Sequence, residues 1–246
     1  MSELIVKPVS SRKDRKQFVN FPWKLYRGDP YWVPPLRANH LELLNYKPHP
    51  FYEYSEIQTF LALRGGEPCG RIAAIVNRAH NQRYQEQRGF FGFFECIDDQ
   101  SVADALFLAA RTWLTERGMQ AMRGPVNPSM NYEIGLLIDG FDSMPTFMMT
   151  YNPPYYGKLF EAAGLQKTQD MYAFWGHVEM LQDLDKKLAF VVEEATRRFD
   201  VKLRTLTVRG SVKTCACSWT STTARWSVPG GLYRCRKPRW ITWPPA

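Results

Sequence analysis

Glu95 is the residue of this sequence best placed to act as a general base. It stands near the end of an apolar segment, GFFGFFECI, at residues 89–97. Partial burial at the end of a strand raises the pKa of a carboxyl group toward neutrality, where the group can accept a proton from an amine. Glu133 is the second candidate for this role. The alternative for Glu95, an ordinary carboxylate that ends a strand, stays open.

A polar segment at residues 127–145, NPSMNYEIGLLIDGFDSMP, is the strongest local signal for a substrate site. Loops that follow central strands commonly supply substrate contacts. The residues expected to make these contacts are Asn127, Ser129, Asn131 and Tyr132, with Asp139 and Asp142 nearby. Asn and Asp side chains also form Asx turns that satisfy the backbone of a loop, so a structural role is open as well.

The positive charge of the chain is unevenly distributed. The chain has 246 residues and a formal charge of +8 at pH 7. Residues 201–246 hold nine Lys or Arg and no Asp or Glu, which leaves 23 basic and 24 acidic residues in 1–200. Nucleic-acid binding would therefore depend on the tail alone, and we expect none. No segment has the roughly 18 apolar residues of a membrane span, and the N-terminus does not read as a signal peptide, so we expect a cytoplasmic protein without a membrane partner.

The segment from Gly210 onward has no helical or strand periodicity. Cys215, Cys217 and Cys235 could be ligands in a metal or nucleic-acid module, but they lack the paired spacing of a zinc site. The four His residues of the chain are scattered too, so no metal is expected. We favour a frameshift in the coding sequence of this segment. If the codons are read in the shifted frame, each residue that precedes a Cys or Trp is replaced by Leu, Met or Val. The segment then has an acidic, amphipathic, helix-like pattern. Residues 209–246 are therefore expected to be non-native.

Apolar periodicity and turn residues predict the secondary structure of residues 3–208. Strands are expected at 3–9, on both sides of a hairpin turn at 64–68, and at 90–97, 119–125, 145–151, 166–178 and 201–208. Helices are expected at 10–26, 36–44, 101–118, 152–164 and 183–200. Ser101 and Asp104 are expected to form a capping box at the start of their helix. Sequential strands before a helical crossover predict an α/β chain with a mixed sheet and helices packed on its faces.

The order of these elements, together with three segments, resembles the GNAT acyltransferase superfamily. The segments are GRIAAIVNRAHNQ, GFFGFFECIDD and YNPPYYGKLFEAAGLQKTQDMYAF, and the motifs GPVNPSMNYEIGLLIDGFD and NPPYY are similar to those of a bacterial branch of it. The resemblance covers residues 3–205. It implies a mixed, mostly antiparallel sheet with helices on both faces, in which the central strands FFGFFECI and MQAMRGP splay apart. It also implies acyl transfer in that gap from acetyl-CoA or another acyl-CoA to a small-molecule amine.

Two departures from the superfamily pattern concern the acyl donor. The superfamily holds the CoA pyrophosphate with a glycine-rich loop at a helix N-terminus, whereas the matching junction here, CIDDQS, has the carboxylates Asp98 and Asp99. We favour a helix-capping role for Asp99 or Ser101. The superfamily's acid tyrosine is replaced by Phe160, so Tyr156 is the expected acid, with a packing role as the alternative. The residues expected to contact the acyl donor are Phe94, Cys96, Ile97, Ser101, Asn152 and Tyr155.

The resemblance divides the chain into three parts. Residues 1–180 are expected to form the acyltransferase domain, and residues 181–208 to open a second similar unit, because members of the branch continue into one. Residues 209–246 are the non-native tail. The expected function is N-acyl transfer, with acetyl transfer favoured, to an unidentified amine. The alternative is a catalytically silent domain of the same fold that binds a ligand or a partner protein: the missing glycine loop and acid tyrosine favour it, whereas the polar segment favours an active site.

Overall fold

The computed structural model describes residues 2–174, 186–199 and 241–242. The strand expected at 201–208 and nearly all of the segment expected to be non-native lie outside these residues. The helix expected at 183–200 is present as α6, Lys186–Phe199. It belongs to a compact unit, Tyr172–Arg236, which is distinct from the unit formed by Met1–Met171 and Lys237–Ala246.

Seven strands of the described residues form one sheet. In sheet order they are β1 (Leu4–Pro8), β2 (Ser55–Arg64), β3 (Glu67–Asn77), β4 (Arg88–Cys96), β5 (Ala121–Gly124), β9 (Ile241–Thr242) and β8 (Gln166–Lys167). Neighbouring strands are antiparallel, except that β4 and β5 run parallel. A separate hairpin consists of β6 (Val126–Asn127) and β7 (Glu133–Ile134). The prediction of a mixed, mostly antiparallel sheet is confirmed.

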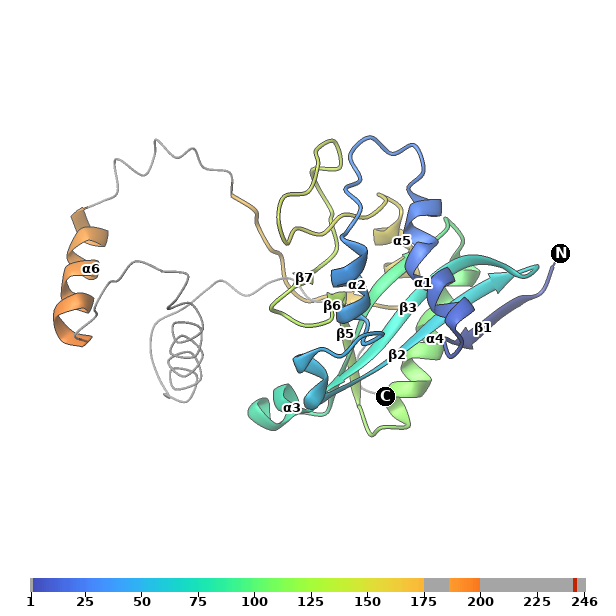
Figure 1. Ribbon diagram of the computed structural model, residues 1–246, viewed down its shortest axis with the longest axis horizontal. Coiled ribbons are helices and arrows are strands. Elements are labelled where there is room, and N and C mark those ends of the chain that lie inside the picture. The colour runs from blue at the N-terminus through green and yellow to red at the C-terminus, as the bar shows by residue number, and fades with distance from the viewer. Residues whose placement is uncertain (1, 175–185, 200–240, 243–246) are drawn as a thin grey trace. The chain divides into compact units, whose positions relative to one another are not determined.

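Helices cover both faces of the sheet (Figure 1). They are α1 (Arg12–Leu25), α2 (Arg37–Leu43), α4 (Gln100–Thr115) and α5 (Tyr156–Ala162). A short helix, α3 (Arg78–Tyr84), and a 3-10 turn, η1 (Pro50–Glu53), have no buried residues. Successive side chains of a strand point to opposite faces. Leu61 of β2 therefore packs with α1 and α2, whereas Phe60 and Ala62 pack with α4 and α5 on the other face.

Local sequence signals explain where several elements begin and turn. Ser11 and Asp14 form a capping box at the start of α1: the Asp14 N–H donates to Ser11 Oγ at 3.1 Å, and the Ser11 N–H donates to Asp14 Oδ2 at 3.3 Å. Gly65 and Gly66 join β2 to β3 with φ angles of +59° and +85°, which favour glycine. The predicted hairpin is thus confirmed.

Three expectations about secondary structure are wrong. Residues 145–151 form no strand, because a turn interrupts them. Within the described residues, the strand expected at 166–178 is limited to β8. Ser101 does not begin a capping box, because Asp99 is the N-cap of α4 and accepts a hydrogen bond from Ser101 N at 2.9 Å. The pattern also failed to predict α3 and the β6–β7 hairpin.

The two parallel strands pair only at one end. Arg88, Gly89 and Phe90 of β4 face Ala121, Met122 and Arg123 of β5, and the ladder then stops. The chains still touch at Gly92, where an added Cβ would lie only 1.5 Å from the carbonyl oxygen of Val126. Beyond this point β4 continues to Cys96 while the other chain turns into the β6–β7 hairpin. The predicted splaying of the two central strands is confirmed.

Candidate functional site

A pocket of about 280 Å³ lies beside β4, past the end of the β4–β5 ladder. Its polar wall includes Arg71, Glu95, Asn127 and Glu133. Its apolar wall is contributed largely by two loops, residues 32–35 before α2 and residues 145–149 before α5. A pocket with apolar walls and a few convergent polar groups is the usual form of a small-molecule site.

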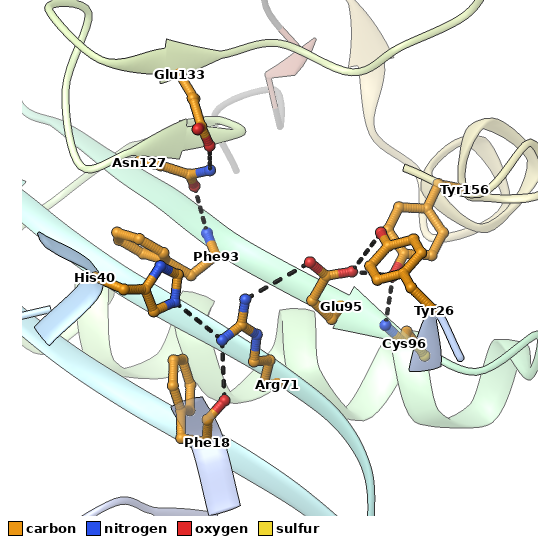
Figure 2. Close-up of polar contacts among 10 residues, drawn as sticks. All are labelled: Phe18, Tyr26, His40, Arg71, Phe93, Glu95, Cys96, Asn127, Glu133 and Tyr156. Carbon is orange, nitrogen blue, oxygen red and sulfur yellow. Dashed lines mark hydrogen bonds and ion pairs between the residues drawn. The ribbon is translucent and has the colours of Figure 1, made fainter. Parts of the chain in front are cut away.

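The Glu95 carboxylate lies at the centre of a polar cluster in this pocket (Figure 2). Its Oε2 atom accepts hydrogen bonds from the phenol groups of Tyr26 and Tyr156, both at 2.8 Å. Its Oε1 atom lies 3.6 Å from Nη2 of Arg71. Burial raises the pKa of Glu95, although the charge of Arg71 and the two phenol donors oppose the shift. The direction agrees with the expectation for a base, and the carboxyl group faces space that a substrate can enter.

Arg71 is a buried cation that joins three elements of the fold. Only 3% of the residue is exposed. Its Nη1 atom donates to the carbonyl oxygen of Phe18 at 2.9 Å and lies 3.2 Å from Nε2 of His40. Because a guanidinium group can only donate, Nε2 of His40 accepts in this contact. Burial, and then the charge of Arg71, lowers the pKa of His40 to about 3, so His40 is neutral near pH 7.

A β-bulge in β4 forms the floor of the pocket. Phe93 and Phe94 stand opposite the single residue Ile72 of β3, and Phe93 has a left-handed φ of +49°. The Phe93 N–H donates to Oδ1 of Asn127 at 2.6 Å. A side chain therefore takes the place that a neighbouring strand would fill.

Asn127 also connects the bulge to Glu133 (Figure 2). Its Nδ2 atom lies 3.4 Å from Oε2 of Glu133, a long hydrogen bond. Desolvation raises the pKa of Glu133, opposed by this bond to Asn127. Both residues line the pocket, so the structure brings the two carboxylates predicted from the sequence to one cavity.

The two neighbouring tyrosines of the NPPYY motif bind the end of β4. Tyr155 donates its phenol proton to the carbonyl oxygen of Cys96 at 2.7 Å. The Cys96 N–H donates to the phenol oxygen of Tyr156 at 2.8 Å. Burial, as the largest cause, holds the pKa of Tyr156 well above its ordinary value. Tyr156 and Phe94 line the pocket, whereas the Cys96 thiol is fully buried and burial raises its pKa.

The N-terminus of α4 is occupied by the chain itself. Asp99 accepts hydrogen bonds from Ser101 N at 2.9 Å and from Ser101 Oγ at 2.6 Å. Arg64 donates to Asp99 Oδ2 at 2.7 Å and to Ser101 Oγ at 3.1 Å. Arg64, and then Ser101, lowers the pKa of Asp99 to about 2. Ile97 donates its N–H to the carbonyl oxygen of Cys69 at 3.1 Å; neither Ile97 nor Ser101 lines the pocket.

The remaining candidate residues hold loops in place. Ser129 and Asn131 share a turn in which Asn131 N donates to Ser129 Oγ at 3.3 Å. The Tyr132 phenol lies 3.3 Å from Nε2 of His49. None of these three candidates lines the pocket. Asn152 does line it, and this buried side chain accepts a hydrogen bond from Leu137 N at 2.7 Å.

The sequence argument missed Tyr26, His40 and Arg71, which contact one another or Glu95. Tyr26 follows α1, His40 lies on α2, and Arg71 lies on β3. One signal was present: Arg71 interrupts an otherwise apolar strand, and a buried charge requires a partner. Nothing in the sequence says that the partner is Glu95.

The described residues show neither a metal cluster nor a spanning helix. No three or more His, Cys, Asp or Glu side chains of that part of the chain are arranged to hold a metal ion. None of its helices combines the length and apolar character needed to cross a membrane.

Two curated proteins are clearly similar to this chain, while no protein-family model matches it. The chain is 38% identical over 174 residues to a protein named bacterial ceramide synthase from Caulobacter vibrioides. It is 38% identical over 171 residues to Protein YghO from Escherichia coli strain K12. Each match covers 70% of this chain, but 45% and 44% of the respective relative. The chain thus spans less than half the length of these relatives.

Solved structures of low sequence identity share part of the arrangement. A tandem GNAT protein from the clavulanic acid biosynthesis pathway matches 68% of this chain and 45% of its own, with 14% identity and a TM-score of 0.47. An aminoglycoside acetyltransferase from an uncultured soil metagenomic sample matches 71% of this chain and 96% of its own, with 11% identity and a TM-score of 0.42. Since both TM-scores are below 0.5, the sheet order and the splayed strands carry the assignment of fold class.

Proposed function

We propose that this chain carries the site of an N-acyltransferase, which transfers an acyl group from a thioester of coenzyme A to a primary amine. The observation that supports this most directly is the position of Glu95. A carboxyl group of raised pKa lines a pocket at the point where two parallel strands part. The similarity to a protein named as a synthase of ceramide, which is an N-acyl compound, supports the same class of reaction.

The residues of the pocket can supply both proton transfers. An amine is mostly protonated at neutral pH and must lose a proton before its nitrogen attacks the thioester carbonyl, and Glu95 accepts that proton. The C–N bond forms, the C–S bond breaks, and the leaving thiolate takes a proton from the phenol of Tyr156. Tyr156 then regains a proton from Glu95, to which it is hydrogen-bonded at 2.8 Å. After the C–N bond forms, the nitrogen still carries one proton more than an amide does, and it releases that proton to water. Over the cycle an ammonium ion and a thioester therefore give an amide, a thiol and one proton in solution, and Glu95 and Tyr156 return to their starting states.

The N-terminus of α4 does not fit the pyrophosphate of coenzyme A as its residues stand. A phosphate there would need the free N–H groups of the first turn, but Asp99 already accepts from Ser101 N. The Asp99 carboxylate would also repel the phosphate. We therefore place only the acyl and thioester end of the donor in the pocket.

The apolar walls favour a long-chain substrate over an acetyl group and a small polar amine. Trp32, Val33 and Pro34 form one side, and Phe147 and Met148 belong to the opposite loop. An acyl chain or the chain of an amino alcohol can bury apolar surface there. The relative named as a bacterial ceramide synthase points the same way, because ceramide combines both kinds of chain.

The test compares Glu95→Gln with the matched variant Glu133→Gln in the whole chain. Acetyl-CoA and palmitoyl-CoA are each supplied with a long-chain amino alcohol, and N-acyl product is measured by mass spectrometry. We expect product from the long-chain pair, a loss of about 100-fold or more in kcat/KM for Glu95→Gln, and a smaller loss for Glu133→Gln. Undiminished kcat/KM in a folded Glu95→Gln variant would exclude the proposed base.

A catalytically silent binding domain is the second candidate, and the self-capped α4 favours it. Thermal shift separates the two functions, because a ligand stabilises the folded chain that binds it. Stabilisation by micromolar acyl-CoA supports the transferase. No shift at millimolar acyl-CoA, together with no product, would favour the silent domain.

A further inference from the structure

We propose that one face of the chain docks on the surface of an anionic lipid bilayer and presents the mouth of the pocket to it. The face has two parts. The basic stripe consists of Lys13, Lys16, Lys24, Arg27 and Arg37. The apolar rim consists of Val33, Leu36, Ile138, Met144, Phe147 and Met148. The proposed contact is with the bilayer surface, and it departs from the expectation of no membrane partner.

Positive charge is concentrated at the basic stripe. Residues 12–37 hold seven Lys or Arg and two Asp, whereas the rest of residues 1–200 hold 16 basic and 22 acidic residues. One of the two acids, Asp14, is buried and paired with Lys7 at 2.7 Å. Lys13 and Lys16 are exposed and form no ion pair with any described residue. Clustered exposed Lys and Arg attract the anionic surface of a bilayer.

The basic stripe borders a shallow hollow on α1. Lys13, Lys16, Asn20 and Lys24 line it, with a volume of about 300 Å³. Glu67 also lines the hollow and pairs with Lys24 at 3.0 Å, which leaves Lys13 and Lys16 as its unpaired cations. Their spacing of three residues places them on one side of the helix. A hollow of this size and charge can accept a phospholipid headgroup.

The stripe is continuous with the mouth of the pocket. Arg37 donates to Asn20 Oδ1 at 2.9 Å, and its guanidinium lies 4.5 Å from the ring centroid of Trp23. Trp23 in turn packs edge-on against Trp32, with ring centroids 5.5 Å apart. Trp32 lines the pocket. The basic surface of α1 therefore leads directly to the pocket.

The side chains of the apolar rim are exposed, and three of them, Val33, Phe147 and Met148, line the pocket. Leu36 is 79% exposed and Phe147 is 93% exposed. The two loops that carry the rim lie side by side: both line the pocket, and Tyr151 donates to Asp29 Oδ2 at 2.8 Å (Figure 1). Large apolar side chains grouped at a pocket mouth mark a contact with lipid or protein.

A bilayer is the partner that matches both parts of the face. Interfacial proteins combine basic side chains, which meet anionic headgroups, with Phe, Trp and Leu, which enter the boundary of the acyl chains. Asp139 and Asp142 are exposed on the rim loop and oppose the attraction, so the rim contributes through apolar insertion and the stripe through charge. If the proposed function holds, a long-chain amine can pass from the bilayer into the pocket without entering water.

The test measures binding of the whole chain to vesicles by co-sedimentation. Vesicles of phosphatidylcholine with one quarter phosphatidylglycerol are compared with phosphatidylcholine alone. The nine basic residues of 201–246 also attract anionic lipid, but all variants share them. Lys13→Gln with Lys16→Gln removes two charges, each worth about fivefold in affinity at a bilayer surface, so we expect binding to weaken by about 30-fold. The matched control, Lys47→Gln with Lys158→Gln, removes two exposed charges elsewhere and should change binding less than threefold.

A second pair of variants tests the apolar rim. Phe147→Ser with Leu36→Ser should weaken vesicle binding at least tenfold. The control is Leu108→Ser, because Leu108 is 63% exposed but lies on α4, at the opposite face of the sheet. This control should leave vesicle binding unchanged. Equal binding of the stripe or rim variants and the unaltered chain would overturn the proposal, as would equal binding to neutral vesicles. Binding to an acidic soluble protein in place of vesicles would overturn it too. Acylation of a short, water-soluble amine should be unaffected by Lys13→Gln with Lys16→Gln, because neither residue lines the pocket, so failure of docking and failure of the transferase are separate results.

Discussion

Tyr156→Phe should destabilise the chain more than Tyr26→Phe, and the difference reports one hydrogen bond. Both phenols donate to Oε2 of Glu95 at 2.8 Å, and both tyrosines are buried, with 2% and 4% of their surface exposed. Tyr156 also accepts from Cys96 N at 2.8 Å. Phenylalanine keeps each ring in place and removes only the hydroxyl group, so the two variants form a matched pair.

The magnitude follows from the bonds that each change removes. Loss of a hydrogen bond to a charged group costs about 1.5–3 kcal/mol, which both variants share. Tyr156→Phe also leaves the buried Cys96 N–H without a partner, at a further cost of about 1–3 kcal/mol. Cys96 is fully buried, so water is not there to replace the phenol. We therefore expect the unfolding free energy to differ between the variants by about 1–3 kcal/mol.

Urea unfolding at pH 7 measures this difference. With a slope of about 2 kcal/mol/M, the midpoint of Tyr156→Phe should lie roughly 0.5–1.5 M below that of Tyr26→Phe. Hydrogen exchange adds a local readout: the Cys96 amide should exchange faster in Tyr156→Phe alone. Equal midpoints and equal exchange would refute the claim that the Tyr156 phenol satisfies the end of β4.

Three further predictions test the parting of the strands and the two titrating carboxylates. Gly92→Ala should lower the free energy of unfolding by more than about 4 kcal/mol, because the new Cβ would lie 1.5 Å from the carbonyl oxygen of Val126. In the control, Gly157→Ala, the new Cβ meets nothing within 4 Å, so this variant should be as stable as the unaltered chain or more stable. Thermal denaturation measures both. Asp99 has a folded pKa of about 2, below its ordinary value of 3.8, so its contribution to stability is present above pH 3.8 and is lost as pH falls toward 2. Asp99→Asn keeps the helix cap but cannot titrate. The urea midpoint of this variant should therefore change less between pH 4 and pH 2 than that of the unaltered chain. Glu95 has a raised pKa, so its contribution to stability is present below pH 4.5 and is lost as pH rises through the folded pKa. Glu95→Gln should remove this decline of the urea midpoint with rising pH. If the midpoint of the variant declines as that of the unaltered chain does, another group is responsible for the decline.

The sequence identified the elements with strong local signals but not the contacts between distant ones. Capping at Ser11, the Gly65–Gly66 turn and the helical spacing after Ser101 depend on neighbouring residues, so α1, the β2–β3 hairpin and α4 were predicted close to their observed bounds. The strand expected at 145–151 failed for a physical reason. Phe147 and Met148 are exposed beside the pocket, and apolar composition alone does not separate a strand from such a loop.

In the site, too, residues with a local signal could be predicted and residues joined by long-range contacts could not. Glu95 could be selected because it is a carboxylate at the end of an apolar strand, and Tyr156 because a phenol was needed near the start of a helix. Tyr26 lies 69 positions from Glu95, and no local pattern links them. Ser129 and Asn131 were selected by composition, yet they bond to each other in a turn away from the pocket.

The β-bulge explains why a charged pair and a pocket occur at the same place. Two residues of β4 oppose one of β3, which changes the direction of the strand just before Glu95 and brings its carboxylate to Arg71 on β3. The separation of 3.6 Å is long for an ion pair, and the two phenols supply the hydrogen bonds that Arg71 does not. Because breaking a buried pair leaves one charge without a partner, Arg71→Met should destabilise the chain at pH 7 and raise the pKa of Glu95 further. A substrate ammonium near Glu95 would have the opposite effect on that pKa, so the pocket is suited to bind a cationic amine and then remove its proton.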